Sequence, residues 1–270
     1  MRFHAFVRRL CFSIIYGLQT GFVWRIGHLH IYEKGFFEYG AGNPGAYGIR
    51  DYEKVISAIT HDPQIKDMVL IATPMLSIAG IAGNFSENVS KPFFGTGVVP
   101  SDHDRMKQWN DYNLRITRKL GSGLSDSDIE GGVIGIGMAR ILHLCDELKV
   151  PNCQNRKYIP PKSDSAADIE DFSALAEPDQ PPASADKRPK IDLLAATVSG
   201  APNVVSMYVN KTENQGFKEL DDNYVAVNIS LAQKLLYGRG EKKVTGIVLQ
   251  LKHTKDMAYV KKHWLACLLI

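Results

Sequence analysis

The sequence lacks the motifs that mark common enzymes and nucleic-acid-binding proteins. It contains no G-x-x-x-x-G-K-[S/T] phosphate loop, no G-x-S-x-G nucleophile and no H-E-x-x-H zinc motif. Its formal net charge is only +3 over 270 residues, and no stretch interleaves aromatic residues with dense Lys and Arg, so no nucleic-acid partner is expected. These absences predict a protein that is not an enzyme and has neither a catalytic residue nor a cofactor.

Cysteine is also scarce, with only Cys11, Cys145, Cys153 and Cys267 in the chain. None forms a C-x-x-C pair and no His lies at ligand spacing from such a pair, so no metal site is expected. Cys145 and Cys153 could form a disulfide in an oxidising compartment, or they could be two unrelated small apolar residues. The sequence alone does not give the distance between them.

The sequence has no apolar run long enough for a complete transmembrane helix. The apolar segment 10–24 follows Arg8 and Arg9, but it falls short of the roughly 20 residues required and carries Gln19. No small-x-small cleavage site follows it, which argues against a secretory signal. We interpret residues 1–25 as a partial transmembrane or anchor helix, with its arginines on the cytoplasmic side. The alternative is an amphipathic helix on a soluble domain.

The rest of the chain alternates between short strands and helices. With 44% hydrophobic and 23% charged residues it has the composition of a globular protein. Strand, helix, strand and strand in the first part predict an α+β sandwich and not a doubly wound sheet. We expect a strand at 28–32, a loop at 33–50, a helix at 51–60 capped by Asp51, extended segments at 68–81 (broken by Pro74 and Gly80) and 93–99, and a surface connection at 101–130.

Two patterns look like binding sites at first sight. His28 and His30 would share one face of a strand, but no third ligand lies nearby, so we expect surface histidines of a half-exposed strand. The segment 131–140 contains G-x-G-x-x followed by Arg140 in place of the third glycine. It also lacks an acidic residue placed about 20 positions later in a βαβ unit, so a dinucleotide site is not indicated.

Residues 151–190 differ in composition from their surroundings. They are rich in Pro, Ser, Asp, Glu and Ala and have few large apolar side chains. Such a segment cannot bury enough surface to offset its ordering entropy, so we predict a disordered insertion. Regular structure is expected to return with strands at 193–198 and 244–251 and a helix at 256–264. The apolar tail 263–270 is either the buried end of that helix or the approach to another membrane segment.

The stretch 200–236 has the most regular pattern. It predicts a strand at 204–209, a turn around Gly216, a strand at 224–229 and a helix capped by Ser230. Glu219, Asp221 and Asp222 form an acidic cluster between the strands, without the pattern of a calcium loop. We expect a solvated turn there, with Asp accepting backbone N–H bonds.

The order of these pieces resembles the periplasmic core domain of MacB- and LolC/LolE-type (FtsX-type) ABC transporter permeases. The matching segments, in chain order, are GHLHIYEKGFF, IRDYEK, GVIGIGMAR, GAPN, QGFKELDD and SLAQKLL. The resemblance covers most of residues 22–262, and the insertion at 151–190 departs from it. It implies a two-lobed α+β domain at 26–262, with one strand-helix-strand lobe that includes the last strand and helix, and one mostly β lobe. It also implies a short strand turning into a helix at 131–140.

The same resemblance implies a function in transport. The domain would lie in the periplasm, anchored to the bacterial inner membrane, and would couple ATP hydrolysis by a separate cytoplasmic ATP-binding subunit to export or extraction of a substrate. Further expected partners are a second permease copy and a periplasmic adaptor or lipoprotein substrate. The expected site is a structural or contact loop made of Gly216, Phe217, Lys218, Glu219, Leu220, Asp221 and Asp222.

Two expectations about the whole protein accompany this interpretation. Permeases of this group have four membrane helices, so we expect a truncated protein or a shortened gene model. The alternative function is a soluble or secreted binding module that uses the same domain without transport activity.

Overall fold

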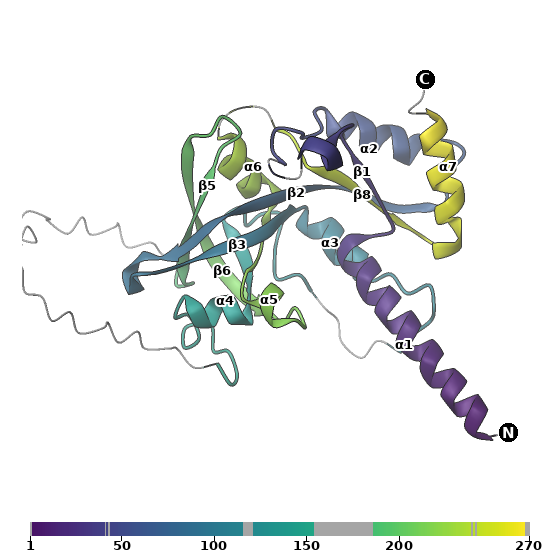
Figure 1. Cartoon of the computed structure of the whole chain (residues 1–270), viewed down its shortest axis with the longest axis horizontal. Coiled ribbons are helices and arrows are strands. Elements are labelled where there is room, and N and C mark those ends of the chain that lie inside the picture. Colours follow the sequence, from purple (N-terminus) through teal and green to yellow (C-terminus); the bar gives the residue numbers. More distant parts are fainter. Residues whose placement is uncertain are drawn as a thin grey trace, which may run out of the picture.

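The computed structural model describes residues 2–40, 42, 44–115, 121–153, 186–238, 240 and 242–267. Within these residues eight strands form one sheet in the order β1-β8-β2-β3-β7-β4-β6-β5, so the chain is a mixed helix-and-sheet protein (Figure 1). The strands are β1 (Leu29–Tyr32), β2 (Val69–Asn84), β3 (Val89–Val98), β4 (Gly131–Gly135), β5 (Lys190–Ala196), β6 (Pro202–Glu213), β7 (Tyr224–Asn228) and β8 (Gly246–Leu251). The helices are α1 (Arg2–Ile26), α2 (Tyr52–His61), α3 (Pro100–Met106), α4 (Ile136–Ile141), α5 (Lys218–Asp221), α6 (Ile229–Tyr237) and α7 (Met257–Cys267).

The long strand β2 belongs to two parts of this sheet. Residues 69–75 pair antiparallel with β8, which in turn pairs with β1. Residues 75–84 pair with β3, and residues 81–83 pair with β5 as well. The contact between β2 and β5 therefore closes β2, β3, β7, β4, β6 and β5 into a ring. Pro74 and Gly80, which were expected to break this segment, lie inside one continuous strand.

The pairing groups the segments much as the sequence predicts. The strand β1 and the start of β2 join the last strand β8, and the middle strands make up most of the ring. Figure 1 shows α4 and α5 together at one end of the ring, α6 at the other, and α1 projecting away from the body. The expected independence of the two groups as separate lobes stays a prediction.

One apolar core joins the sheet to the helices. The core includes side chains from both groups of strands, and each has at most 9% of its surface exposed. Burial of each such side chain contributes about 1.5–3 kcal/mol, so this core is the main link between the ring, α2 and α6. Representative members are Ile59, Leu76, Ile134, Met207, Val227, Leu235 and Leu249.

Of the two predicted helix caps, Ser230 is wrong, whereas Asp51 is the N-cap residue of α2 but makes no side-chain capping bond. Ser230 lies within α6, and its backbone N–H donates to the side chain of Asn228 at 3.0 Å, so Asn228 is the N-cap. Asp51 precedes α2, but its φ of 49° is left-handed and its side chain makes no capping bond. Its carboxylate lies 3.4 Å from Lys54. A capping residue normally has extended backbone, a requirement that the residue type alone does not reveal.

Segments predicted as irregular contain short helices. The loop 33–50 includes a π-helix at Phe36–Gly40, and the turn 216–222 includes α5. The surface connection 101–130 begins with α3 and places Trp109 in the core with 4% of its surface exposed. Short helices depend on packing more than on their own periodicity, so their sequences carry little signal.

The predicted insertion lies mostly outside the described residues, which omit 154–185. Its predicted end at residue 190 is wrong, because Arg188 already pairs with Asp128 and Asp186 and β5 begins at Lys190. The predicted tail 263–270 is part of α7 as far as Cys267.

Candidate functional site

The predicted loop 216–222 forms a tight corner between β6 and β7. Gly216 has a φ of 84°, in the left-handed region that favours glycine. Its N–H donates to the side chain of Asn214 at 2.7 Å. The corner presents two large apolar side chains to solvent, because Phe217 is 70% and Leu220 56% exposed.

Two contacts of charged residues lie within the single helical turn of the corner. Lys218 Nζ lies 2.6 Å from the carboxylate of Asp222, four residues later. The carbonyl of Glu219 accepts from the side chain of Asn223 at 2.6 Å. These exposed contacts are worth little individually, so the turn depends mainly on its neighbours.

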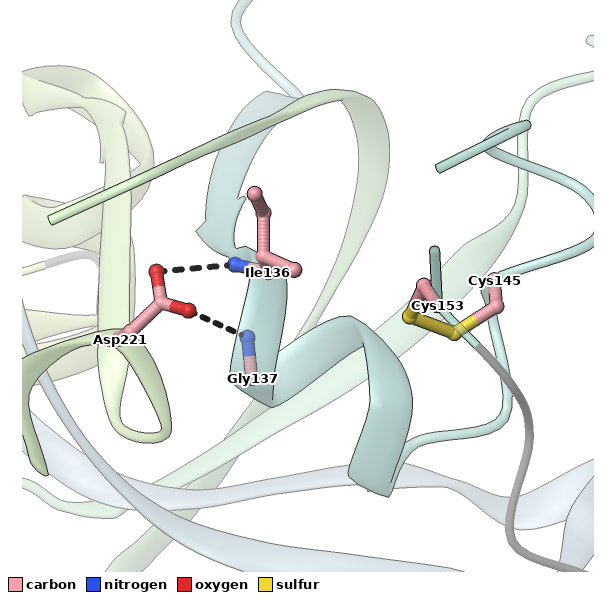
Figure 2. Close-up of a disulfide and its surroundings, with 5 residues drawn as sticks. All are labelled: Ile136, Gly137, Cys145, Cys153 and Asp221. Carbon is pink, nitrogen blue, oxygen red and sulfur yellow. Dashed lines mark hydrogen bonds between the residues drawn. A yellow bond between two sulfur atoms is a disulfide. The ribbon is translucent and has the colours of Figure 1, made fainter. Parts of the chain in front are cut away.

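The key neighbour of the corner is α4, whose first turn faces Asp221 (Figure 2). The Asp221 carboxylate accepts backbone N–H bonds from Ile136 at 3.1 Å and Gly137 at 2.8 Å. It accepts a third from Gln215 at 3.2 Å. The first N–H groups of a helix lack partners within it and attract negative charge. Asp221 therefore accepts backbone N–H bonds as expected, but it does so to join α5 to α4.

The glycines of segment 131–140 allow this close approach. A side chain at Gly135 would overlap the backbone of Asp221, and one at Gly137 would overlap the side chain of Asp222. The N–H groups that a dinucleotide phosphate would use are thus taken by Asp221. The segment is a strand that turns into a helix, β4 followed by α4.

On the other side of α4, Cys145 and Cys153 form a disulfide with their Cα atoms 5.6 Å apart (Figure 2). Cys145 is only 2% exposed. The interpretation of these cysteines as two unrelated residues is therefore wrong. The bridge fixes the chain immediately after α4, where residues beyond 153 leave the described part.

The helix α1 is fixed to the domain at its C-terminal end. Gln250 Nε2 donates to the carbonyl of Val23 at 3.3 Å, and Trp24 Nε1 donates to the carbonyl of Trp109 at 2.6 Å. Arg25 donates to Gln215 Oε1 at 2.7 Å, which ties α1 to the segment just before the corner.

The other face of α1 is exposed and apolar. Its large apolar side chains recur every three or four residues and are 44–61% exposed. Among the residues that the structure describes, no helix has both the length and the apolar character required to cross a membrane. The exposed side chains are Phe12, Ile15, Leu18, Phe22 and Ile26, with Ile14 beside them.

A cavity of about 230 Å³ lies where α1, α3 and α5 meet the sheet. Arg25 and Leu220 line it and are also exposed, so they stand at its rim. Inside, Lys107 Nζ lies 3.3 Å from Glu213 Oε1. Burial, with a contribution from Lys107, lowers the pKa of His103 to about 4, so this imidazole is neutral at pH 7.

His28 and His30 are half-buried and do not simply face solvent. His28 Nδ1 accepts the N–H of Leu251 at 3.0 Å, which supports the pairing of β1 with β8. Burial lowers the pKa of both imidazoles. Within the described ranges, no group of three or more His, Cys, Asp or Glu residues could hold a metal ion.

Sequence reasoning placed the corner but missed the cavity beside it. Arg25, His103 and Gln215 come from segments far apart in the chain, and only Gln215 belongs to one of the segments singled out above, QGFKELDD. Only the fold brings them together, so the sequence carries no signal for this grouping.

Comparison with known proteins finds likenesses among solved structures. No family model and no curated protein matches the chain. One similar solved structure is the extracellular domain of the noncanonical ABC-type transporter YknZ from Gram-positive bacteria. It is 12% identical, with a TM-score of 0.41, over 85% of this chain and 86% of that chain. Neither value is high enough to assign a fold.

Proposed function

We propose that this chain is the membrane-anchored extracytoplasmic part of an ABC transporter permease of the lipoprotein-releasing or MacB type. A separate cytoplasmic subunit would hydrolyse ATP, and a second permease copy would complete the transporter. The observation that supports this proposal is that α1 has two different faces. The helix exposes an apolar stripe and is also hydrogen-bonded to the body of the domain.

The apolar stripe of α1 suits a membrane environment. Its spacing of three and four residues gives one continuous face, and exposed apolar faces of this kind bind lipid or another helix. The bonds of α1 reach β8 through Gln250, α3 through the Trp109 segment, and the corner through Gln215. A displacement of α1 in the membrane would therefore reach both groups of strands.

The disulfide supports an extracytoplasmic position for the domain. Disulfides such as Cys145–Cys153 persist in the periplasm and outside cells and are rare in the reducing cytosol.

We propose the corner 216–222 as the contact loop of this domain, for an adaptor protein or a lipoprotein substrate. Phe217 and Leu220 project from it, and exposed apolar side chains are frequent anchors of protein interfaces. The three N–H bonds of Asp221 give these anchors a fixed base on α4. A contact loop on such a base loses little entropy when it binds.

The first test is membrane association of the full chain in a bacterial cell. We expect the chain to stay with membranes after a carbonate wash, and the double variant Leu18→Asn/Phe22→Asn to be released. Phe85→Asn, which changes a 65% exposed side chain remote from α1, is the matched control and should stay membrane-bound. Release of the unaltered chain would favour the alternative, a soluble or secreted binding module.

The second test addresses transport. Purification of the chain from mild-detergent extracts should recover an ATP-binding subunit in stoichiometric amounts. The variant Phe217→Ser/Leu220→Ser should keep that subunit and lose an adaptor or substrate protein. Recovery of a membrane-bound chain without any ATP-binding subunit would contradict the transporter assignment.

A further inference from the structure

The cavity between α1, α3, α5 and the sheet has a mainly apolar wall. Its volume of about 230 Å³ is below that of drug-sized sites, which begin at about 300 Å³. Water occupies about 30 Å³ per molecule, so the space suits roughly eight non-hydrogen atoms. The apolar wall is formed by Pro74, Met75, Val98, Val99, Met106 and Val248.

Polar atoms in this wall lack partners. Thr73 Oγ1, His103 Nδ1 and Gln215 Nε2 are buried without a hydrogen bond within the described part of the chain. Thr73 is 6% and Gln215 7% exposed, so neither residue has ready access to bulk water. A buried polar group left unsatisfied costs about 1–3 kcal/mol, which makes three in one cavity a marker of an occupant.

The Gln215 amide is oriented for one kind of ligand atom. Its Oε1 accepts from Arg25 at 2.7 Å, which leaves Nε2 as a free donor. An occupant must therefore offer an acceptor oxygen to Gln215, because an N–H or ammonium group would meet another donor.

The charges around the cavity favour an anion. Arg25 and Lys107 are cationic, Glu213 is anionic and pairs with Lys107, and His103 is neutral at pH 7. The lining thus carries one net positive charge. A negative group near Gln215 would gain from Arg25 in a partly desolvated setting.

We propose that this cavity binds a small, mainly apolar carboxylate, with its oxygen on Gln215 Nε2 and its chain along the wall of Met75, Val98 and Met106. Eight non-hydrogen atoms correspond to a carboxylate of roughly six carbons, since its two oxygens count as well. The ligand enters between Arg25 of α1 and Leu220 of α5, two exposed members of the lining. This site goes beyond the transport proposal and does not depend on it.

The test is photolabelling of the full chain, in detergent micelles, with a diazirine analogue of hexanoic acid. We expect saturable labelling of the peptides that contain Met75, Val98 or Met106, and competition by hexanoate but not by hexylamine. Gln215→Glu removes the donor and adds a negative charge while keeping an acceptor for Arg25, so it should weaken labelling at least about tenfold. Gln64→Glu makes the same change at an exposed position and should leave labelling unaltered.

Two further variants separate loss of the site from loss of the fold. Ala226→Phe fills the cavity from β7 and should abolish the label. Thr73→Val keeps the shape, removes an unpartnered hydroxyl and should weaken labelling while the chain unfolds at an unchanged or higher denaturant concentration. Label confined to α1, equal competition by hexylamine, or unaltered labelling of Gln215→Glu would each overturn the proposal and leave water as the occupant.

Discussion

Asp221 is the residue on which the geometry of the corner depends. Three backbone N–H groups from two segments converge on its carboxylate, and two of them are the first N–H groups of α4. Within the described residues, its neighbour Asp222 forms an ion pair with Lys218, whose side chain is 77% exposed. These two adjacent aspartates thus differ strongly in how much they contribute to the stability of the corner.

This difference gives a prediction for stability. Asp221→Ala leaves three N–H groups without their charged acceptor and should lower the free energy of unfolding by about 2–3 kcal/mol. Asp222→Asn loses one exposed ion pair and should cost less than about 1 kcal/mol. Urea denaturation of both variants checks this, and equal losses would contradict the assigned role of Asp221.

His103 should make stability depend on pH. Its pKa is about 4 in the folded chain and 6.5 as the ordinary value, so below pH 6.5 the unfolded chain binds a proton that the folded chain does not. The free energy of unfolding is therefore highest above pH 6.5 and decreases as the pH falls towards 4, by about 3 kcal/mol in total. Burial is the main cause of this low pKa, and the charged groups that face the imidazole also act on it. They are Arg25, Lys107, Asp104 and Glu213.

The check is the slope of unfolding free energy between pH 6.5 and 4. His103→Leu should flatten this slope, whereas His61→Leu, on the exposed face of α2, should not. The lowered pKa values of His28 and His30 also reduce stability at acid pH. The quantity to compare is therefore the difference in slope between His103→Leu and His61→Leu. An unaltered slope in His103→Leu would show that this imidazole is not held neutral.

At the scale of elements, alternation and apolar spacing located the strands and the longer helices. β6 and α6 could be predicted because each buries a face that repeats within its own sequence, and β7 because it is a short apolar run buried on both faces. The helices α3 and α5 could not be predicted from their own sequences. Contacts of Trp109 and Gln250 hold α3, and the bond between Asp221 and the first turn of α4 holds α5. The cavity escaped prediction for the same reason, since its lining runs from Arg25 to Val248.

The disulfide after α4 should contribute measurably to stability. Cys145 and Cys153 are separated by 8 positions, and closing so short a loop is worth about 2–3 kcal/mol in the chain-entropy model. Cys145→Ser/Cys153→Ser should lower the unfolding free energy by that amount. Alkylation and mass spectrometry of protein from an oxidising compartment should find both cysteines blocked until a reductant is added. Alkylation of both without reductant would contradict the bridge.

At the scale of the whole molecule, Gln250 joins three elements. It is fully buried in β8, and its amide donates to the carbonyls of Val23 in α1 and Met106 in α3. Gln250→Met keeps the volume and removes these donors. We expect hydrogen exchange of the last turn of α1 to become about tenfold faster while the ring is unaffected.

A matched variant tests whether this effect is specific. Gln233 is also a buried glutamine, but it bonds to the carbonyl of Lys243 and belongs to α6. Gln233→Met should leave exchange in α1 unaltered. Equal acceleration of α1 in both variants would show general destabilisation and no special coupling through Gln250.

The pairing of β1 with β8 has a consequence for how the chain folds during synthesis. β1 ends at Tyr32 and its partner begins at Gly246, so more than two hundred residues must emerge before that pair can form. The ring closes earlier, because its last strand in the sequence, β7, ends before β8 begins. Pairings of such long sequence separation are slow to form and expose strand edges in the interval. A nascent chain that stops short of β8 would therefore present the edge of β1 and the first half of β2 to chaperones and proteases.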